Sequence, residues 1–134
     1  MAETDKTVQV AIMRSQLGRV RGLGAAKSGV GHWWVQRLTA LALVPLSLWF
    51  IFNILHLLGA PHEAVIDWIS SPWTIVLMIA LVVATFQHAQ LGLQVVIEDY
   101  IHDDAVRLAA LLAVKAAAIL LGMACVVSVL KMGL

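Results

Sequence analysis

The sequence predicts an all-α membrane protein with three transmembrane helices. Of its 134 residues, 61% are hydrophobic and only 13% are charged, whereas soluble domains carry about a quarter charged residues. The apolar residues gather in three segments, which are residues 38–58, 73–97 and 105–130. Each segment is long enough to cross about 30 Å of hydrocarbon as a helix.

The basic residues predict how the chain is oriented. Residues 1–37 form a basic N-terminal segment ahead of the membrane region, residues 38–134, and hold six of the nine Lys and Arg residues. Because basic residues beside the first span favour the cytoplasmic side, we expect a cytoplasmic N-terminus and an external C-terminus. A basic tail joined to a spanning helix is typical of a topology signal, and no nucleic-acid partner is predicted.

The first span has a marked beginning and an expected bend. Trp33 and Trp34 precede it, at the level where indole rings meet lipid headgroups. Pro45 lies inside it and lacks the backbone N–H of a regular helix, so we expect a bend there. The glycine-rich stretch before the span, residues 19–31, predicts an irregular lead-in rather than a helix.

The second span carries most of the polar residues of the membrane region. Gln87, His88, Gln90 and Gln94 all lie within residues 73–97. Lipid offers them no hydrogen-bond partner, so they are expected to face protein or a cofactor. Because three helices enclose a site poorly, the chain is predicted to be part of a larger heteromeric helical bundle.

His88 is the candidate metal ligand. An ionisable side chain at mid-membrane is costly and indicates a function, and neutral imidazole is a common axial ligand of haem iron. Ala84, Thr85, Leu91 and Gly92 share its helix face, and three of the four are small. Small neighbours let a flat macrocycle or a second helix approach closely, so the residues alone leave haem ligation and a hydrogen bond to another helix both open.

Asp99 and Tyr100 lie where the second span meets water. Asp99 follows His88 by eleven residues, which is about 16 Å along a helix. A phenol at the bilayer edge can donate a hydrogen bond to a quinone carbonyl, and an adjacent carboxylate can position it. A tyrosine of the interfacial aromatic belt is the alternative.

Charged residues also mark the boundaries of the third span. The segment between the second and third spans, residues 98–104, contains four carboxylates and predicts either a surface for a basic partner or a solvated turn. Arg107 lies near the start of the third span and Lys115 inside it. We expect the Lys115 side chain to reach toward the cytoplasmic interface.

The remaining histidines give fewer constraints. His32 and Arg37 lie at the cytoplasmic start of the first span, where they can meet a haem propionate or a lipid phosphate. His56 lies near the external end of that span, too far in depth from His88 for one iron to bind both. A second axial ligand would therefore come from another chain.

The segment from His88 to Tyr100 resembles one family of hydrophobic membrane anchors, the cytochrome b type anchors of succinate dehydrogenase (respiratory complex II). That family has a haem-ligating histidine, a glycine four residues later, and Asp-Tyr at eleven and twelve. Here these positions are His88, Gly92, Asp99 and Tyr100. Arg37-Leu-Thr-Ala is similar to the family's Arg-x-Thr-Ala, and the resemblance covers about residues 28–131.

The resemblance implies a function, cofactors and partners. An anchor of this family pairs with a second, different membrane anchor around one haem b, with a histidine from each, and the two anchors hold an iron–sulfur protein and a flavoprotein with FAD. Carried over, His88 is the axial ligand of the haem iron, Tyr100 binds ubiquinone, and Asp99 neighbours it. Arg37 and His32 are candidates for propionate contact, although His32 does not align with the family's histidine.

The implied reaction belongs to the complex, so the chain is expected to act only as a non-autonomous part of succinate dehydrogenase (quinone). The expected location is the bacterial cytoplasmic (inner) membrane, with the mitochondrial inner membrane as the alternative. Other functions also stay open. They are a fumarate reductase anchor that uses menaquinol, a structural scaffold without a cofactor, and a small component of a transporter.

Overall fold

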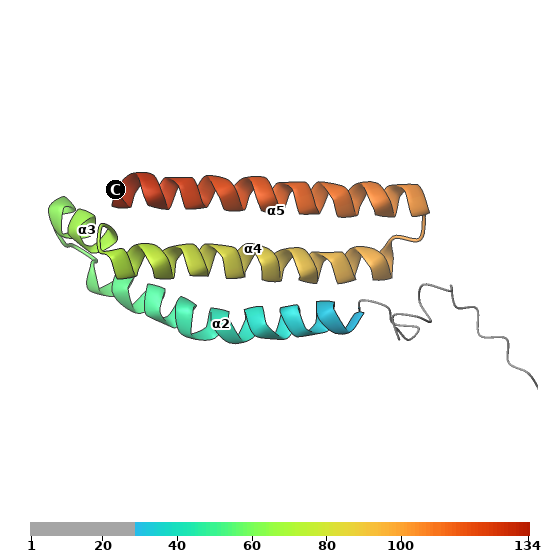
Figure 1. The fold of residues 1–134 in the computed structure, drawn as a ribbon, viewed down its shortest axis with the longest axis horizontal. Helices are drawn as coiled ribbons and strands as arrows, with labels where there is room; N and C mark the ends of the chain where they lie inside the picture. Colours follow the sequence, from blue (N-terminus) through green and yellow to red (C-terminus); the bar gives the residue numbers. More distant parts are fainter. Residues whose placement is uncertain (1–28) are drawn as a thin grey trace, which may run out of the picture. The chain divides into compact units, whose positions relative to one another are not determined.

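The structure, a computed structural model, describes residues 29–134, and these residues are helical apart from short connections (Figure 1). The helices are α2 (Gly29–His56), α3 (His62–Ile69), α4 (Pro72–Tyr100) and α5 (Asp104–Gly133). α2, α4 and α5 are long and apolar enough to cross a membrane, and the described residues contain no strand. The predicted all-α fold with three spanning helices is confirmed.

The helices extend beyond the apolar segments that predicted them. α4 continues to Tyr100, so Asp99 and Tyr100 lie on the same helix as His88, as their predicted distance along the helix assumed. The turn assigned to residues 98–104 was wrong for residues 98–100, which form the last turn of α4. A helix needs no apolar residue once it reaches water, because its backbone hydrogen bonds are internal. The connection to α5 is therefore only residues 101–103.

α2 likewise begins before the apolar segment, at Gly29. The prediction of an irregular backbone was wrong for residues 29–31, where helix propagation from the span outweighs a glycine penalty of about 1 kcal/mol per residue. The rest of the glycine-rich stretch and most of the basic segment lie outside the described residues. Pro45 lies inside α2, and the bend expected there stays a prediction.

A short helix, α3, fills the segment between the first two spans. Gly59 takes a positive φ of 78° and turns the chain after α2. Trp68 of α3 then stacks on Trp49 of α2, with ring centroids 6.0 Å apart. Its Nε1 donates to Asn53 Oδ1 at 3.0 Å, and Asn53 Nδ2 donates to the Trp49 carbonyl at 2.8 Å. These contacts hold α3 against the end of α2.

α4 lies between α2 and α5 in the compact unit formed by residues 32–134 (Figure 1). α4 and α5 are antiparallel, and small residues allow their close contact. A Cβ added at Gly122 would lie 3.4 Å from the Phe86 ring, and one at Gly133 would clash with Ile75 at 2.7 Å. Such contacts replace the hydrophobic driving force, which is absent between helices in lipid.

The connection between α4 and α5 is short and well capped. The Asp103 carboxylate accepts from the Val106 backbone N–H at 2.9 Å, and Arg107 forms an ion pair with Asp104. With Glu98, which accepts from Gln94 Nε2, three of the four carboxylates of residues 98–104 therefore have partners within the described residues. In Figure 1 the connection lies at the end of the unit opposite α3 and the C-terminus. Which end faces the cytoplasm stays a prediction.

Candidate functional site

The candidate metal ligand on α4 contacts α2 at mid-length. His88 Nδ1 lies 3.1 Å from Thr39 Oγ1, and both side chains are half-buried. This hydrogen bond joins residues from two spanning helices, where lipid would offer neither of them a partner. Of the two uses that the sequence left open for His88, one ring nitrogen thus serves a contact with another helix.

The hydrogen bonds of Thr39 indicate which nitrogen of His88 carries the proton. The Thr39 hydroxyl donates to the Val35 carbonyl at 2.8 Å, within its own helix. A hydroxyl has one proton, so with that proton used the oxygen is left to accept a hydrogen bond from His88 Nδ1–H. In a neutral imidazole the other nitrogen then holds a lone pair. This tautomer presents Nε2 as a metal ligand.

The small residues around His88 have two different uses. Ala84 is buried, and Gly92 lies against α2, where an added Cβ would come within 3.8 Å of Gln36 Nε2. Thr85 is exposed on α4. The space beside Gly92 on this face is thus reached by the Gln36 side chain of α2.

Gln36 contributes a buried acceptor to the same region. Its Oε1 atom is buried and has no hydrogen-bond partner among residues 29–134. A buried acceptor without a donor costs about 1–3 kcal/mol. A donor from beyond the described residues would remove that penalty.

Sequence reasoning did not identify Thr39 or Gln36 as partners of the His88 region. The depth of Thr39 and of His88 in the membrane could have indicated their contact. Thr39 lies about 15 Å from the start of α2 and His88 about 18 Å from the end of α4, and these two helix ends lie on one side of the unit. A threonine and a histidine at matching depth in successive spans were therefore candidates for a hydrogen bond.

The candidate quinone residues lie at the end of the same helix. Tyr100 is 78% exposed, and Asp99 is exposed beside it. Within residues 29–134 no hydrogen bond uses the Tyr100 hydroxyl, whereas the neighbouring Glu98 accepts one from Gln94 Nε2 at 2.8 Å. Both candidates are thus open to an external ligand, about 16–18 Å from His88 along the helix axis.

The structure does not bring His32 and Arg37 together. Arg37 lies over the Trp33 ring, with its guanidinium carbon 5.4 Å from the ring centroid, which is a cation–π arrangement. Five residues apart on a helix, the two side chains point roughly 140° apart. His32 instead lines a groove that also contains Lys115 of α5.

The other histidines do not join His88. His56 is the last residue of α2 and His62 the first of α3, at the end opposite to Tyr100 in Figure 1. Within residues 29–134 no three His, Cys, Asp or Glu side chains converge to hold a metal ion. His88 therefore offers a single protein ligand from this part of the chain.

Comparison with known proteins places the chain. Residues 11–122 match the profile of the succinate dehydrogenase/fumarate reductase transmembrane subunit. A succinate dehydrogenase hydrophobic membrane anchor subunit of Rickettsia bellii is 36% identical over 120 residues, covering 90% of this chain and 96% of the relative. A succinate dehydrogenase membrane anchor subunit of Reclinomonas americana is 30% identical over 97 residues, covering 69% and 80%.

A more distant relative from Paracoccus denitrificans, also a succinate dehydrogenase hydrophobic membrane anchor subunit, is 27% identical over 79 residues, covering 59% of this chain and 61% of the relative. No solved structure matches the chain. The profile match spans most of the sequence, and the Rickettsia bellii relative aligns over nearly its whole length. The chain therefore belongs to the family of transmembrane subunits of succinate dehydrogenase and fumarate reductase, among the succinate dehydrogenase membrane anchors.

Proposed function

We propose that this membrane anchor co-ligates haem b through His88 and contributes Tyr100 and Asp99 to a ubiquinone site, as part of succinate:ubiquinone oxidoreductase. The observation that carries the proposal is the bond between Thr39 Oγ1 and His88 Nδ1 at 3.1 Å. Metal-ligating histidines almost always use their other nitrogen for such a bond, which fixes the ring and its tautomer.

The residues around His88 fit a haem. Haem, when bound, would accept and donate single electrons. His88 Nε2 would bind the haem iron, and Thr39 would hold the imidazole ring through its bond to Nδ1. The second axial ligand would come from a second membrane anchor, because His56 lies at the far end of α2.

The quinone half of the proposal rests on the exposed end of α4. The Tyr100 hydroxyl would donate a hydrogen bond to a quinone carbonyl oxygen, which gains negative charge as the ring is reduced. A donor aimed at developing charge stabilises it more than it stabilises the neutral ground state. Asp99, adjacent and exposed, would position the phenol or accept its proton.

The proposed partners are a second membrane anchor, an iron–sulfur protein and a flavoprotein that carries FAD. The latter two would dock at the Tyr100 end, on the cytoplasmic side where the basic N-terminal residues are predicted to lie. The proposed location is the bacterial cytoplasmic membrane, which suits the relatives from Rickettsia and Paracoccus.

The purified complex that contains this chain tests the proposal directly. We expect a b-type absorption band that appears when dithionite is added, and ubiquinone as the extracted quinone. A complex without a b-type band would contradict haem ligation and favour a cofactor-free scaffold or a transporter component. A complex that carries menaquinone and works only as a fumarate reductase would contradict the ubiquinone assignment but keep the family.

Thr39→Val is expected to weaken haem retention without abolishing it. Valine keeps the shape of threonine and removes the oxygen that accepts from His88 Nδ1. Loss of such an outer partner typically costs about 10–100-fold in affinity for the bound metal group. The measurement is haem b per complex after stepwise dilution in detergent.

Ser128→Ala is the matched control for that experiment. Ser128 is exposed on α5, and its hydroxyl donates only within its own helix, to the Ala124 carbonyl at 2.8 Å. It therefore reproduces the loss of a helix-internal hydroxyl bond away from the His88 face. Equal haem retention in Thr39→Val and Ser128→Ala would contradict the role given to Thr39.

A further inference from the structure

Lys115 is a cation deep inside a spanning helix. It lies eleven residues into α5, about 16 Å from the start of the helix, and its side chain is exposed on the helix surface. A charged group at this depth is costly unless it has a partner. The only ion pair within residues 29–134 joins Arg107 to Asp104, so Lys115 has no counter-charge in the described part of the chain.

Lys115 lines a polar groove of about 290 Å³ to which three helices contribute. Its walls are His32 from α2, Gln90, Leu91 and Gln94 from α4, and Leu111, Leu112, Val114 and Lys115 from α5. None of these residues is acidic. The groove thus offers an ammonium group, an imidazole and two side-chain amides, which are donors suited to an anionic oxygen group.

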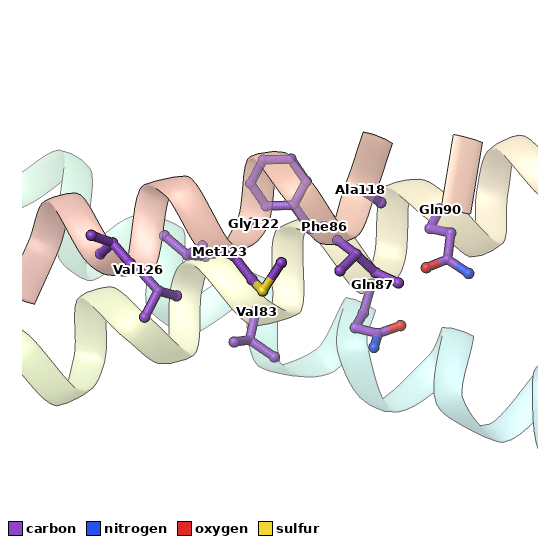
Figure 2. Close-up of a pocket in the computed structure, with 11 residues that line it drawn as sticks. Val83, Phe86, Gln87, Gln90, Ala118, Gly122, Met123 and Val126 are labelled. Atoms are coloured by element: carbon purple, nitrogen blue, oxygen red, sulfur yellow. The ribbon is translucent and has the colours of Figure 1, made fainter. Parts of the chain in front are cut away.

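A second, apolar groove continues from the first along α4 and α5. It has a volume of about 330 Å³ and is lined by Val82, Val83, Phe86, Gln87, Gln90, Ala118, Ile119, Gly122, Met123, Val126 and Val127. Gln90 belongs to both grooves, and Figure 2 shows it at one end of the row of apolar side chains. Because the helices are antiparallel, the polar groove lies toward the Tyr100 end and the apolar groove toward mid-membrane.

We propose that the two grooves together bind one anionic phospholipid from the leaflet at the Tyr100 end. The phosphate pairs with Lys115 and His32, and an acyl chain lies along the seam between Phe86 and Met123. A phospholipid matches the grooves in charge and in arrangement. Its anionic phosphate suits the donor-rich groove near the interface, and its acyl chain suits the apolar groove deeper in the membrane. The site lies beside the proposed haem and quinone residues, and the proposal does not depend on either cofactor.

Two other occupants, a quinone and a helix of a partner protein, match the grooves less well. A quinone has a tail for the apolar groove, but its neutral head leaves the charge of Lys115 uncompensated. A partner helix with a carboxylate supplies the charge, but a helix about 10 Å wide is bulkier than an acyl chain for a groove of about 330 Å³. Both serve as contrary outcomes in the test.

The test is retention of phospholipid by the whole purified complex. Native mass spectrometry and phosphorus analysis after delipidation in mild detergent are expected to find one bound phospholipid for each copy of this chain. Lys115→Met is expected to lower its occupancy about tenfold or more, because a charge-assisted contact is lost. Lys131→Met is the matched control, since Lys131 lies in the last turn of α5, outside both grooves.

A second variant tests the apolar groove. Ala118→Phe fills the seam and leaves Lys115 in place, and it is expected to lower phospholipid occupancy as well. Dioleoylphosphatidylglycerol added to the delipidated wild-type complex should rebind, whereas dioleoylglycerol, which has the same chains but no phosphate, should not.

Several results would overturn the proposal. They are wild-type complex without retained phospholipid, Lys115→Met that keeps it at the wild-type level, and ubiquinone retained in its place. The b-type spectrum is recorded on the same samples, so a failure of the phospholipid proposal can be distinguished from a failure of the haem assignment.

Discussion

His88→Ala is expected to remove the b-type haem signal from membranes that still contain the assembled complex. The substitution deletes Nε2, which the bond between Nδ1 and Thr39 leaves free to bind iron. No other histidine of the described residues lies at that depth, so no second imidazole of α2, α4 or α5 is placed to replace it. The measurement is a dithionite-reduced minus oxidised spectrum, normalised to the amount of this chain in the membrane.

His56→Ala is the control for His88→Ala. His56 is exposed at the last residue of α2, so its removal tests a histidine of the same chain away from the proposed iron. We expect a wild-type spectrum from this variant. A full b-type signal in His88→Ala, at normal amounts of the chain, would rule out His88 as the ligand.

Tyr100→Phe is expected to lower succinate–quinone turnover about tenfold or more. Phenylalanine keeps the ring and removes only the hydroxyl, which is bonded to nothing within residues 29–134. Loss of a hydrogen bond to a neutral acceptor costs about 0.5–1.5 kcal/mol, and the cost rises when the acceptor gains charge. A tenfold fall in rate corresponds to about 1.4 kcal/mol.

Two further assays make the Tyr100 result specific. Succinate oxidation by an artificial dye, which accepts electrons upstream of the quinone, should be unchanged in Tyr100→Phe membranes. His102→Asn, an exposed neighbour in the connection to α5, should leave quinone reduction unchanged. If Tyr100→Phe reduced quinone at the wild-type rate, Tyr100 would be an aromatic-belt residue instead.

The spanning helices were predictable because lipid imposes a single solution on a long apolar segment. α3 was not predictable in this way. It has only eight residues, among them His62, Glu63 and Asp67, and a polar connection of that length is usually interpreted as a loop. Its position depends on the stacking of Trp68 on Trp49 and on the bond to Asn53. These are contacts between segments 15–19 residues apart, which no local pattern reveals.

The residues of the candidate site and their depth in the membrane were predictable from the sequence. The side chains of other helices that contact them were not. The face of α4 that carries His88 follows from helix geometry, whereas the rotation of α2 that brings Thr39 to it does not. The same limit applies to Lys115. Its depth is evident from the sequence, but its groove with His32 and Gln94 requires the actual packing of three helices.

The short connection between α4 and α5 has a thermodynamic consequence for whatever binds at Tyr100. Only residues 101–103 separate the two helices, and the cap by Asp103 together with the pair of Asp104 and Arg107 fixes how α5 begins. The backbone of Tyr100 therefore has little conformational freedom before a ligand arrives. Ordering a rotamer-rich side chain on binding costs about 0.5–1.5 kcal/mol, and a phenol on a fixed backbone has few rotamers to lose. A ligand held there meets a donor whose backbone is already ordered, and more of the interaction energy remains available for affinity.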